Sequence, residues 1–350
     1  MYSKLMWVLF AVFGFLLTSS NDVTAASEFE GVTLTVASYG GKWDETQTVS
    51  IAERLKKQYG IEVIYRPGVA IQHIARAVIM KDHPEFDLMF IDSPNMPRAI
   101  DAGIIDEVTE KDVPSLQNIY REAREFGNRG VPIVFSPFGL AYNTNRIKTP
   151  PTAYADLWNP EYKGKVALFD LTNDAGVVTL LAVATSLGGG VNNVEPAFAK
   201  LKTLRPNLVT VSPSTEAIAQ LLQQEEAWVA PLYSGRTLVL KNQGVPVKLV
   251  IPKDGAYTTI VYLNVVKGSP KRAAALKYVE LAIDEEAQLA IATRSFYPPT
   301  NRTVKLPANI SDQLPFYGAE NVRARTTVDW AAVAKNRPAW IERWHQELGM

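Results

Sequence analysis

Residues 154–170 read YADLWNPEYKGKVALFD, and this stretch indicates the fold more clearly than any other part of the chain. It opens with a helical turn that Pro160 ends, and a turn at Lys163-Gly164 leads into an apolar run from Val166 to Phe169. An apolar run of this length is typical of a parallel strand covered on both faces. Asp170 follows it directly, and ligands of open α/β sheets bind at the carboxyl ends of such strands.

The segments on either side of this stretch alternate between strand and helix patterns. The spacing of apolar residues predicts strands over 32–38, 62–65 and 87–91, and helices over 43–59, 71–80, 175–187, 194–204 and 215–224. Ser269 before Pro270 predicts the start of a long helix that reaches Thr293. This alternation predicts an α/β fold of two doubly wound parallel sheets.

Two β-rich runs lie between the compact α/β blocks, from Pro137 to Asn143 and from Thr259 to Asn264. We expect each run to cross from one lobe of the protein to the other. Two or more strands between lobes form a hinge, so the sequence predicts a protein whose halves can move relative to each other.

The first 26 residues have the layout of a secretory signal peptide. Lys4 precedes an apolar run from Leu5 to Leu17, and small residues lead to a predicted cleavage after Ala25 or Ala26. About thirteen apolar residues are short for a bilayer span, which needs about twenty, and a short membrane anchor is the alternative. The chain has no cysteine, which excludes disulfides, thiolate metal sites and a lipid-anchored cysteine. We therefore expect a free periplasmic protein.

Charge and motifs exclude several classes of function. The chain carries 36 basic and 36 acidic residues, so it lacks the basic excess that nucleic-acid binding needs. It contains no G-x-S-x-G, H-E-x-x-H, G-x-x-x-x-G-K-[ST] or G-x-G-x-x-G motif. Its three histidines, at positions 73, 83 and 345, form no catalytic or metal-binding pattern. We expect no enzyme activity, cofactor or metal.

Several blocks along the chain resemble a family of transport proteins. They include LTVASYGGKWDE from Leu34, FDLMFIDS from Phe86, GLAYNTNRI from Gly139, and SFYPPTN from Ser295. A longer block begins at Ala227 and reads AWVAPLYSGRTLVLKNQGVPVKLVIPKDG. In this order and spacing they resemble type II periplasmic solute-binding proteins of ATP-driven importers, in particular the spermidine/putrescine group and its ferric-ion and small-anion relatives.

The resemblance implies how the protein is organised and what it contacts. Lobe 1 would comprise residues 27–138 plus 262–301, and lobe 2 residues 139–261 plus 302–350. A monomer would capture a small-molecule ligand between these lobes by hinge closure. It would then deliver the ligand to the membrane permease of an ABC importer.

Two clusters of candidate ligand-binding residues belong to the first predicted lobe. Tyr39 and Trp43 flank the glycines between the first strand and the first helix, where the family places an aromatic contact. The alternative is a tight turn with Trp43 packed on the core. Asp92 and Ser93 follow the third strand, where relatives place ligand-bonding hydroxyls, and Ser93 as the N-cap of a helix from Pro94 is the alternative.

Three further candidates lie in the stretch FDLTND, where polyamine binders carry acidic residues that hold an ammonium group. They are Asp170, Thr172 and Asp174, and the alternative for Asp174 is to cap the helix from Ala175. Tyr233 falls where relatives have an aromatic ligand residue. Arg236 could bind a carboxylate or phosphate, or form a surface salt bridge.

Departures from the family pattern narrow the ligand class. The stretch 256–261, which includes the candidate Thr258, lacks the acid and the Trp of polyamine binders, and Tyr233 stands alone where ferric binders have two adjacent tyrosines. A small zwitterion or organic anion is therefore favoured, with a polyamine as the alternative. Functions of another class are a secreted hydrolase or lyase that uses carboxylates, and a sensor that presents its ligand to a receptor.

Overall fold

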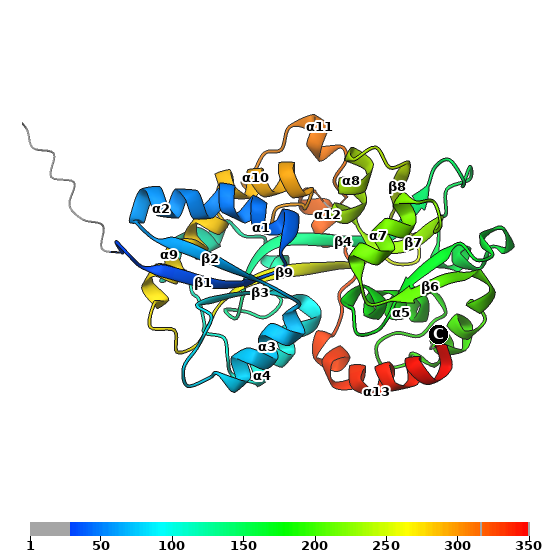
Figure 1. The fold of residues 1–350 in the computed structure, drawn as a ribbon, viewed down its shortest axis with the longest axis horizontal. Coiled ribbons are helices and arrows are strands. Elements are labelled where there is room, and N and C mark those ends of the chain that lie inside the picture. The colour runs from blue at the N-terminus through cyan, green and yellow to red at the C-terminus, as the bar shows by residue number, and fades with distance from the viewer. Residues whose placement is uncertain (1–28, 316, 349–350) are drawn as a thin grey trace, which may run out of the picture.

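The computed structural model describes residues 29–315 and 317–348, so the predicted signal peptide lies outside the described residues. Figure 1 shows an elongated molecule with two α/β halves, joined in the middle by β4 and β9. The strands follow the order β2-β1-β3-β9-β4-β7-β5-β6, and β8 pairs with β4. The predicted α/β fold with two sheet regions is confirmed.

The first half contains a mixed sheet. Its parallel strands are β1 (Thr33–Ser38), β2 (Glu62–Pro67) and β3 (Leu88–Asp92), and β9 (Thr258–Val265) runs antiparallel to β3. The helices of this half are α1 (Gly41–Gln47), α2 (Glu53–Tyr59), α3 (Ala70–Ile79), α4 (Met96–Asp101), α9 (Arg272–Ala282), α10 (Glu285–Ser295), α11 (Ala308–Ser311) and α12 (Ala319–Arg323). A π-helical segment, Thr48–Ala52, makes α1 and α2 continuous, as the helix predicted over 43–59 requires.

The second half repeats the arrangement around the stretch 154–170. Its strands are β5 (Val166–Phe169), β6 (Leu208–Ser212), β7 (Val229–Tyr233) and β8 (Val247–Val250). Strand β5 is fully buried and runs parallel to β6 and β7, as its apolar run predicts. The helices are α5 (Asp174–Ser186), α6 (Glu195–Lys202), α7 (Thr215–Gln223), α8 (Ser234–Asn242) and α13 (Trp330–Leu348).

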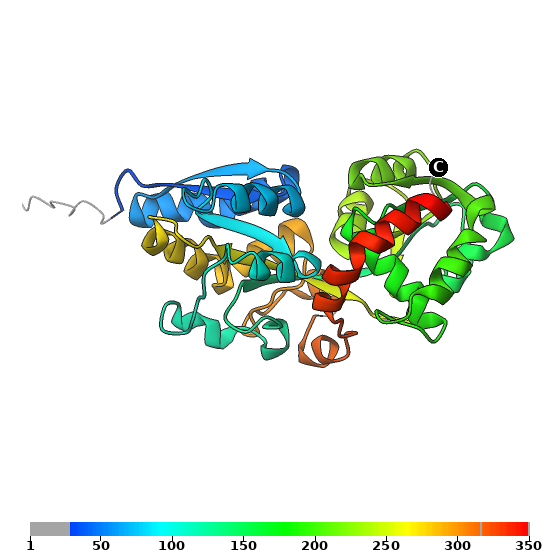
Figure 2. The same ribbon diagram turned by 90° about the horizontal axis from the view of Figure 1, so that it is seen from below.

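The long strand β4 (Val131–Asn143) belongs to both halves. Residues 131–137 pair with β9, and residues 138–142 pair with β7. The amide of Phe138 donates to the carbonyl of Tyr257 just before β9 begins, at 2.9 Å. The chain therefore passes between the halves at 137/138 and 257/258, and passes a third time through residues 324–329, which link α12 to α13. Figure 2 shows α13 lying along the second half.

Two separate hydrophobic clusters underlie the two halves. The first core draws its buried residues from segments 34–135 and 260–291 together with Val322. The second core draws them from segments 138–257 and 330–344. Burial of apolar side chains is the main favourable term in folding, so each half has its own source of stability.

The single helix predicted from Pro270 to Thr293 is wrong, because the structure contains α9 and α10 instead. The Asp284 carboxylate accepts a hydrogen bond from the Ala287 amide at 2.8 Å and so caps a new helix. The Ser269 hydroxyl accepts from the Lys271 amide, and α9 begins one residue later. Among the described residues, no helix combines the length and the apolar character that a membrane span requires.

Candidate functional site

Two adjoining cavities, of about 410 and 230 Å³, lie between the halves. Five residues line both cavities, so we treat them as one cleft: Tyr39, Val69, Asp92, Thr215 and Tyr233. Tyr39 packs on the first core and Tyr233 on the second. A molecule bound in this cleft would therefore contact both halves at once.

Tyr39 reaches the cleft because the chain turns sharply after β1. Gly40 adopts a φ of 79°, which an L side chain rarely adopts, and the chain then enters α1. The Asp44 carboxylate accepts hydrogen bonds from the Ser38 hydroxyl at 2.9 Å and the Gly40 amide at 3.1 Å, and these bonds hold the turn. The ring of Tyr39 lies 5.7 Å from that of Trp43, which lines the smaller cavity.

Asp92 is the acidic group that both cavities share. It ends β3, and the Tyr39 hydroxyl donates to its carboxylate at 2.8 Å. Burial, together with the negative charge of Asp174, raises the pKa of Asp92 to about 7. The ionised form of Asp92 is thus destabilised in the described structure, and a bound cation would stabilise that form.

Asp174 lines the larger cavity from the first turn of α5. Its carboxylate forms a 2.6 Å ion pair with Arg337 of α13 and accepts a hydrogen bond from the Asn95 side chain at 2.7 Å. The helix cap predicted for Asp174 is wrong, because the Asn173 side chain accepts from the Ala175 amide instead. The Asn95 bond joins the two halves across the cleft.

Basic groups line the smaller cavity. Arg236, in the first turn of α8, lies 3.3 Å from the exposed Glu216, and its side chain is 41% exposed. Arg236 therefore forms the surface salt bridge foreseen as one alternative and also lines the cleft, and its role in binding a carboxylate or phosphate stays a prediction. Lys42 lines the same cavity and pairs with exposed Glu45 at 3.2 Å.

Tyr297 completes the aromatic lining of the smaller cavity. Its ring lies 6.2 Å from the Trp43 ring. A Cβ atom at Gly235 would come within 2.6 Å of the Tyr297 ring, so only glycine permits α8 to approach this closely. Burial raises the pKa of Tyr297, and the positive charge of Arg236, which lines the same cavity, opposes this shift.

Of the four remaining predicted site residues, one lines the cleft and three do not. Thr172 lines the larger cavity. Asp170 does not line it; its carboxylate accepts from Thr172 and lies 2.9 Å from His345. Ser93 is fully buried and does not cap a helix, since its hydroxyl accepts from the Ile260 amide at 2.9 Å and so ties β9 in place. Thr258 is buried and outside the lining of both cavities.

Asn95, Tyr297 and Arg337 are among the lining residues that the sequence analysis did not predict. Tyr297 lies in the SFYPPTN block, so its position in an ordered family motif is a signal that could have identified it. Arg337 lies on a polar helix more than 160 residues after Asp174, and nothing in the sequence spacing links the two. The backbone topology alone brings them together.

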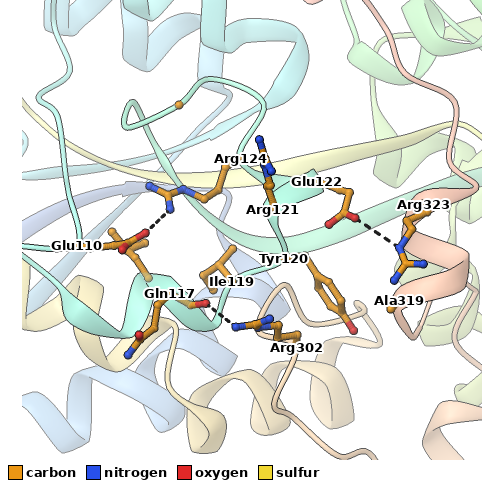
Figure 3. A pocket seen from close by; sticks show the side chains of 12 residues that line it. Glu110, Gln117, Ile119, Tyr120, Arg121, Glu122, Arg124, Arg302, Ala319 and Arg323 are labelled. Carbon is orange, nitrogen blue, oxygen red and sulfur yellow. Dashed lines mark hydrogen bonds and ion pairs between the residues drawn. The ribbon is translucent and has the colours of Figure 1, made fainter.

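A hollow of about 730 Å³ lies elsewhere, around Tyr120 (Figure 3). Arg124 pairs with Glu110 at 2.8 Å and Arg323 with Glu122 at 3.6 Å, so two of its four lining arginines are paired with glutamates. Its lining comes from residues 110–127, 302 and 319–323, which pack with the first core. A ligand there would not bridge the halves. Within the described residues, no group of three or more acidic, histidine or cysteine side chains could hold a metal ion.

Comparisons with known proteins agree with this architecture. The chain is 25% identical to a gamma-aminobutyric acid-binding protein of Pseudomonas aeruginosa, over 91% of this chain and 94% of that protein. It is 23% identical to spermidine/putrescine-binding periplasmic protein 1 of Haemophilus influenzae, over 95% and 94%. Its fold matches the periplasmic binding protein AfuA of Actinobacillus pleuropneumoniae with a TM-score of 0.75, at 18% identity over 92% and 100% of the two chains.

The family model for bacterial extracellular solute-binding proteins matches residues 81–325. That match covers most of the chain, including β3, β4 and β9 and the greater part of the second half. Such proteins are non-enzymatic components of transport, which agrees with the absence of catalytic motifs. The chain belongs to the bacterial extracellular solute-binding proteins.

Proposed function

We propose that the protein captures a small zwitterion that carries one ammonium group and one carboxylate or phosphoryl group. The observation that carries this proposal is the charge pattern of the cleft. Asp92, among the described lining carboxylates, has no basic partner, whereas Asp174 pairs with Arg337 and Glu216 with Arg236. A single ammonium group would supply the missing countercharge.

The anionic end of the ligand would bind in the smaller cavity. Arg236 and Lys42 line that cavity, and both pair only with exposed carboxylates. Exposed pairs contribute little, about 0–1 kcal/mol, so either cation can rotate onto a ligand at low cost. The guanidinium of Arg236 matches a carboxylate or phosphoryl group with two parallel hydrogen bonds. Gamma-aminobutyric acid, named for the Pseudomonas relative, has one group of each charge.

Aromatic side chains would hold the body of the ligand. Tyr39 and Tyr233 line both cavities, and Trp43 and Tyr297 line the smaller one. Aromatic faces attract ammonium groups and also bury the methylene chain between the charged ends. A micromolar dissociation constant corresponds to about 8 kcal/mol, which a few charged hydrogen bonds and these contacts can supply.

A polyamine is the second candidate ligand. Two carboxylates, Asp92 and Asp174, line the larger cavity, and one of the relatives is named for spermidine and putrescine. The ion pair between Asp174 and Arg337 argues against it, because that carboxylate already has a buried countercharge. A dication would meet one free carboxylate and one buried cation.

Closure of the cleft would commit the ligand to transport. Tyr39 and Asp92 extend from the first half, while Asp174, Tyr233 and Arg236 extend from the second. A ligand that contacts both halves binds the closed state more tightly than an open one, and it shifts the equilibrium by that difference in affinity. We expect the closed, monomeric complex to be the form that the permease receives.

Isothermal titration calorimetry with three four-carbon compounds tests the ligand class. Putrescine carries two ammonium groups, 4-aminobutyrate one ammonium and one carboxylate, and succinate two carboxylates, so the series varies charge at nearly constant length. We expect the wild-type protein to bind 4-aminobutyrate most tightly. Tightest binding of putrescine would replace the proposal with the polyamine alternative, and tightest binding of succinate would replace it with an organic anion.

The variant Arg236→Ala tests the anionic end of the ligand. We expect it to weaken 4-aminobutyrate by about 1.5–3 kcal/mol, the value of hydrogen bonds to charged groups. This is less than a fully buried arginine would contribute, because the side chain is 41% exposed. Arg146→Ala is the matched control, since Arg146 also pairs with a glutamate but lies outside the cleft. Equal losses in the two variants would contradict the assignment.

A further inference from the structure

Arg337 uses its whole guanidinium to hold the segment that carries Asp174. Its Nε donates to the Leu171 carbonyl at 3.0 Å, one terminal nitrogen to the Thr172 carbonyl at 2.9 Å, and the other to the Asp174 carboxylate at 2.6 Å. The side chain is only 9% exposed, and its helix α13 packs against α4 of the first half and α6 of the second. The partners of the guanidinium thus lie in the second half, while the helix that carries Arg337 packs against both halves.

These contacts decide the charge of the larger cavity. One oxygen of Asp174 accepts from Arg337 and the other from the Asn95 side chain, so both oxygens are already occupied. Asp92 lines the same cavity, and its described side-chain partner is the uncharged Tyr39 hydroxyl. Two carboxylates and one arginine therefore face this cavity, and their sum is a single negative charge when Asp92 is ionised.

We infer that Arg337 is the residue that limits the cleft to a ligand with one ammonium group. By neutralising Asp174, Arg337 leaves Asp92 as the one carboxylate available to a cationic ligand. This inference rests on the proposed function, in which the ammonium group of the ligand binds Asp92. Removal of one member of a buried ion pair leaves the other charge uncompensated. Without Arg337, the two carboxylates together would attract a dication.

The test measures how Arg337→Gln changes the ratio of the dissociation constants of putrescine and 4-aminobutyrate. We expect the affinity for putrescine, relative to that for 4-aminobutyrate, to be at least tenfold higher than in the wild-type protein. Arg337→Lys is the matched control, because it keeps the positive charge but loses the bonds to Leu171 and Thr172. It should keep the wild-type ratio while its melting temperature falls. An equal shift in both variants would mean that Arg337 only supports the local structure.

Two further variants keep the inference testable if Arg337→Gln does not fold. Asp174→Asn leaves Arg337 without its carboxylate, so the ratio of succinate to putrescine affinity should shift toward succinate at least tenfold. Arg337→Gln with Asp174→Asn removes both charges and should return the wild-type preference. If both affinity ratios stay within twofold of their wild-type values in every variant that folds, the inference is overturned. The proposed function is tested separately, by the order of the three affinities in the wild-type protein.

Discussion

At the scale of single residues, Asp92 and Asp174 show how the same side chain takes two roles. Both line the larger cavity, but Asp174 has a buried arginine beside it and Asp92 a tyrosine hydroxyl. The sequence predicts both as ligand-binding residues, because Asp92 follows the third strand and Asp174 lies where polyamine binders carry acidic residues. It does not distinguish them, because the distinction comes from Arg337, which lies far away in the chain.

The raised pKa of Asp92 leads to a pH-dependent affinity. The unfolded value is about 3.9, and burial beside Asp174 raises the folded pKa to about 7. The proton bound in the folded state stabilises the free protein below the unfolded pKa, and this contribution is lost as the pH rises through about 7. An ammonium ligand needs the ionised carboxylate, so its binding releases a proton near neutral pH.

We therefore expect 4-aminobutyrate to bind about tenfold more tightly at pH 8 than at pH 6. Asp92→Asn should bind it weakly, with little dependence on pH over the same range, because the amide does not ionise. Calorimetry at pH 6, 7 and 8 on both proteins measures this. Wild-type affinity that is constant or falls with rising pH would show that the ammonium group does not meet Asp92.

At the scale of helices and strands, sequence patterns predict the existence of elements better than their ends. The apolar run 166–169 corresponds to β5, and the helix predicted over 43–59 corresponds to the continuous α1–α2. These elements are predictable because the pattern of apolar residues, continuous in β5 and helically spaced in α1–α2, matches their burial. The break between α9 and α10 is not, because it depends on a side-chain cap at Asp284 within a sequence that otherwise favours helix.

The cap at Asp284 gives a prediction of stability. Asp284→Ala should lower the free energy of unfolding by about 1 kcal/mol, since it removes the bond to the Ala287 amide. Asp284 also pairs with Arg54, so Glu286→Ala, which removes another partner of Arg54 without the cap, is the matched control. Urea unfolding of both variants measures the difference. A loss no larger than that of Glu286→Ala would contradict the role of the cap.

At the scale of the whole molecule, the structure arranges two cores around one cleft. β4 belongs to both halves, and the chain passes between them at 137/138, 257/258 and 324–329. The sequence predicts the first two passages from their β-rich character. A third passage is implied by the family resemblance and not by any β-rich run, and this passage delivers α13 and with it Arg337. The lobe boundaries, 27–138 plus 262–301 and 139–261 plus 302–350, remain a prediction.

The central claim is that a zwitterion binds between the halves in one orientation. A crystal structure of the complex with 4-aminobutyrate tests it most directly. We predict that the ligand lies between Tyr39 and Tyr233, with its ammonium group within hydrogen-bonding distance of Asp92 and its carboxylate toward Arg236. A ligand in the hollow around Tyr120, or one whose carboxylate faces Asp92, would contradict the account.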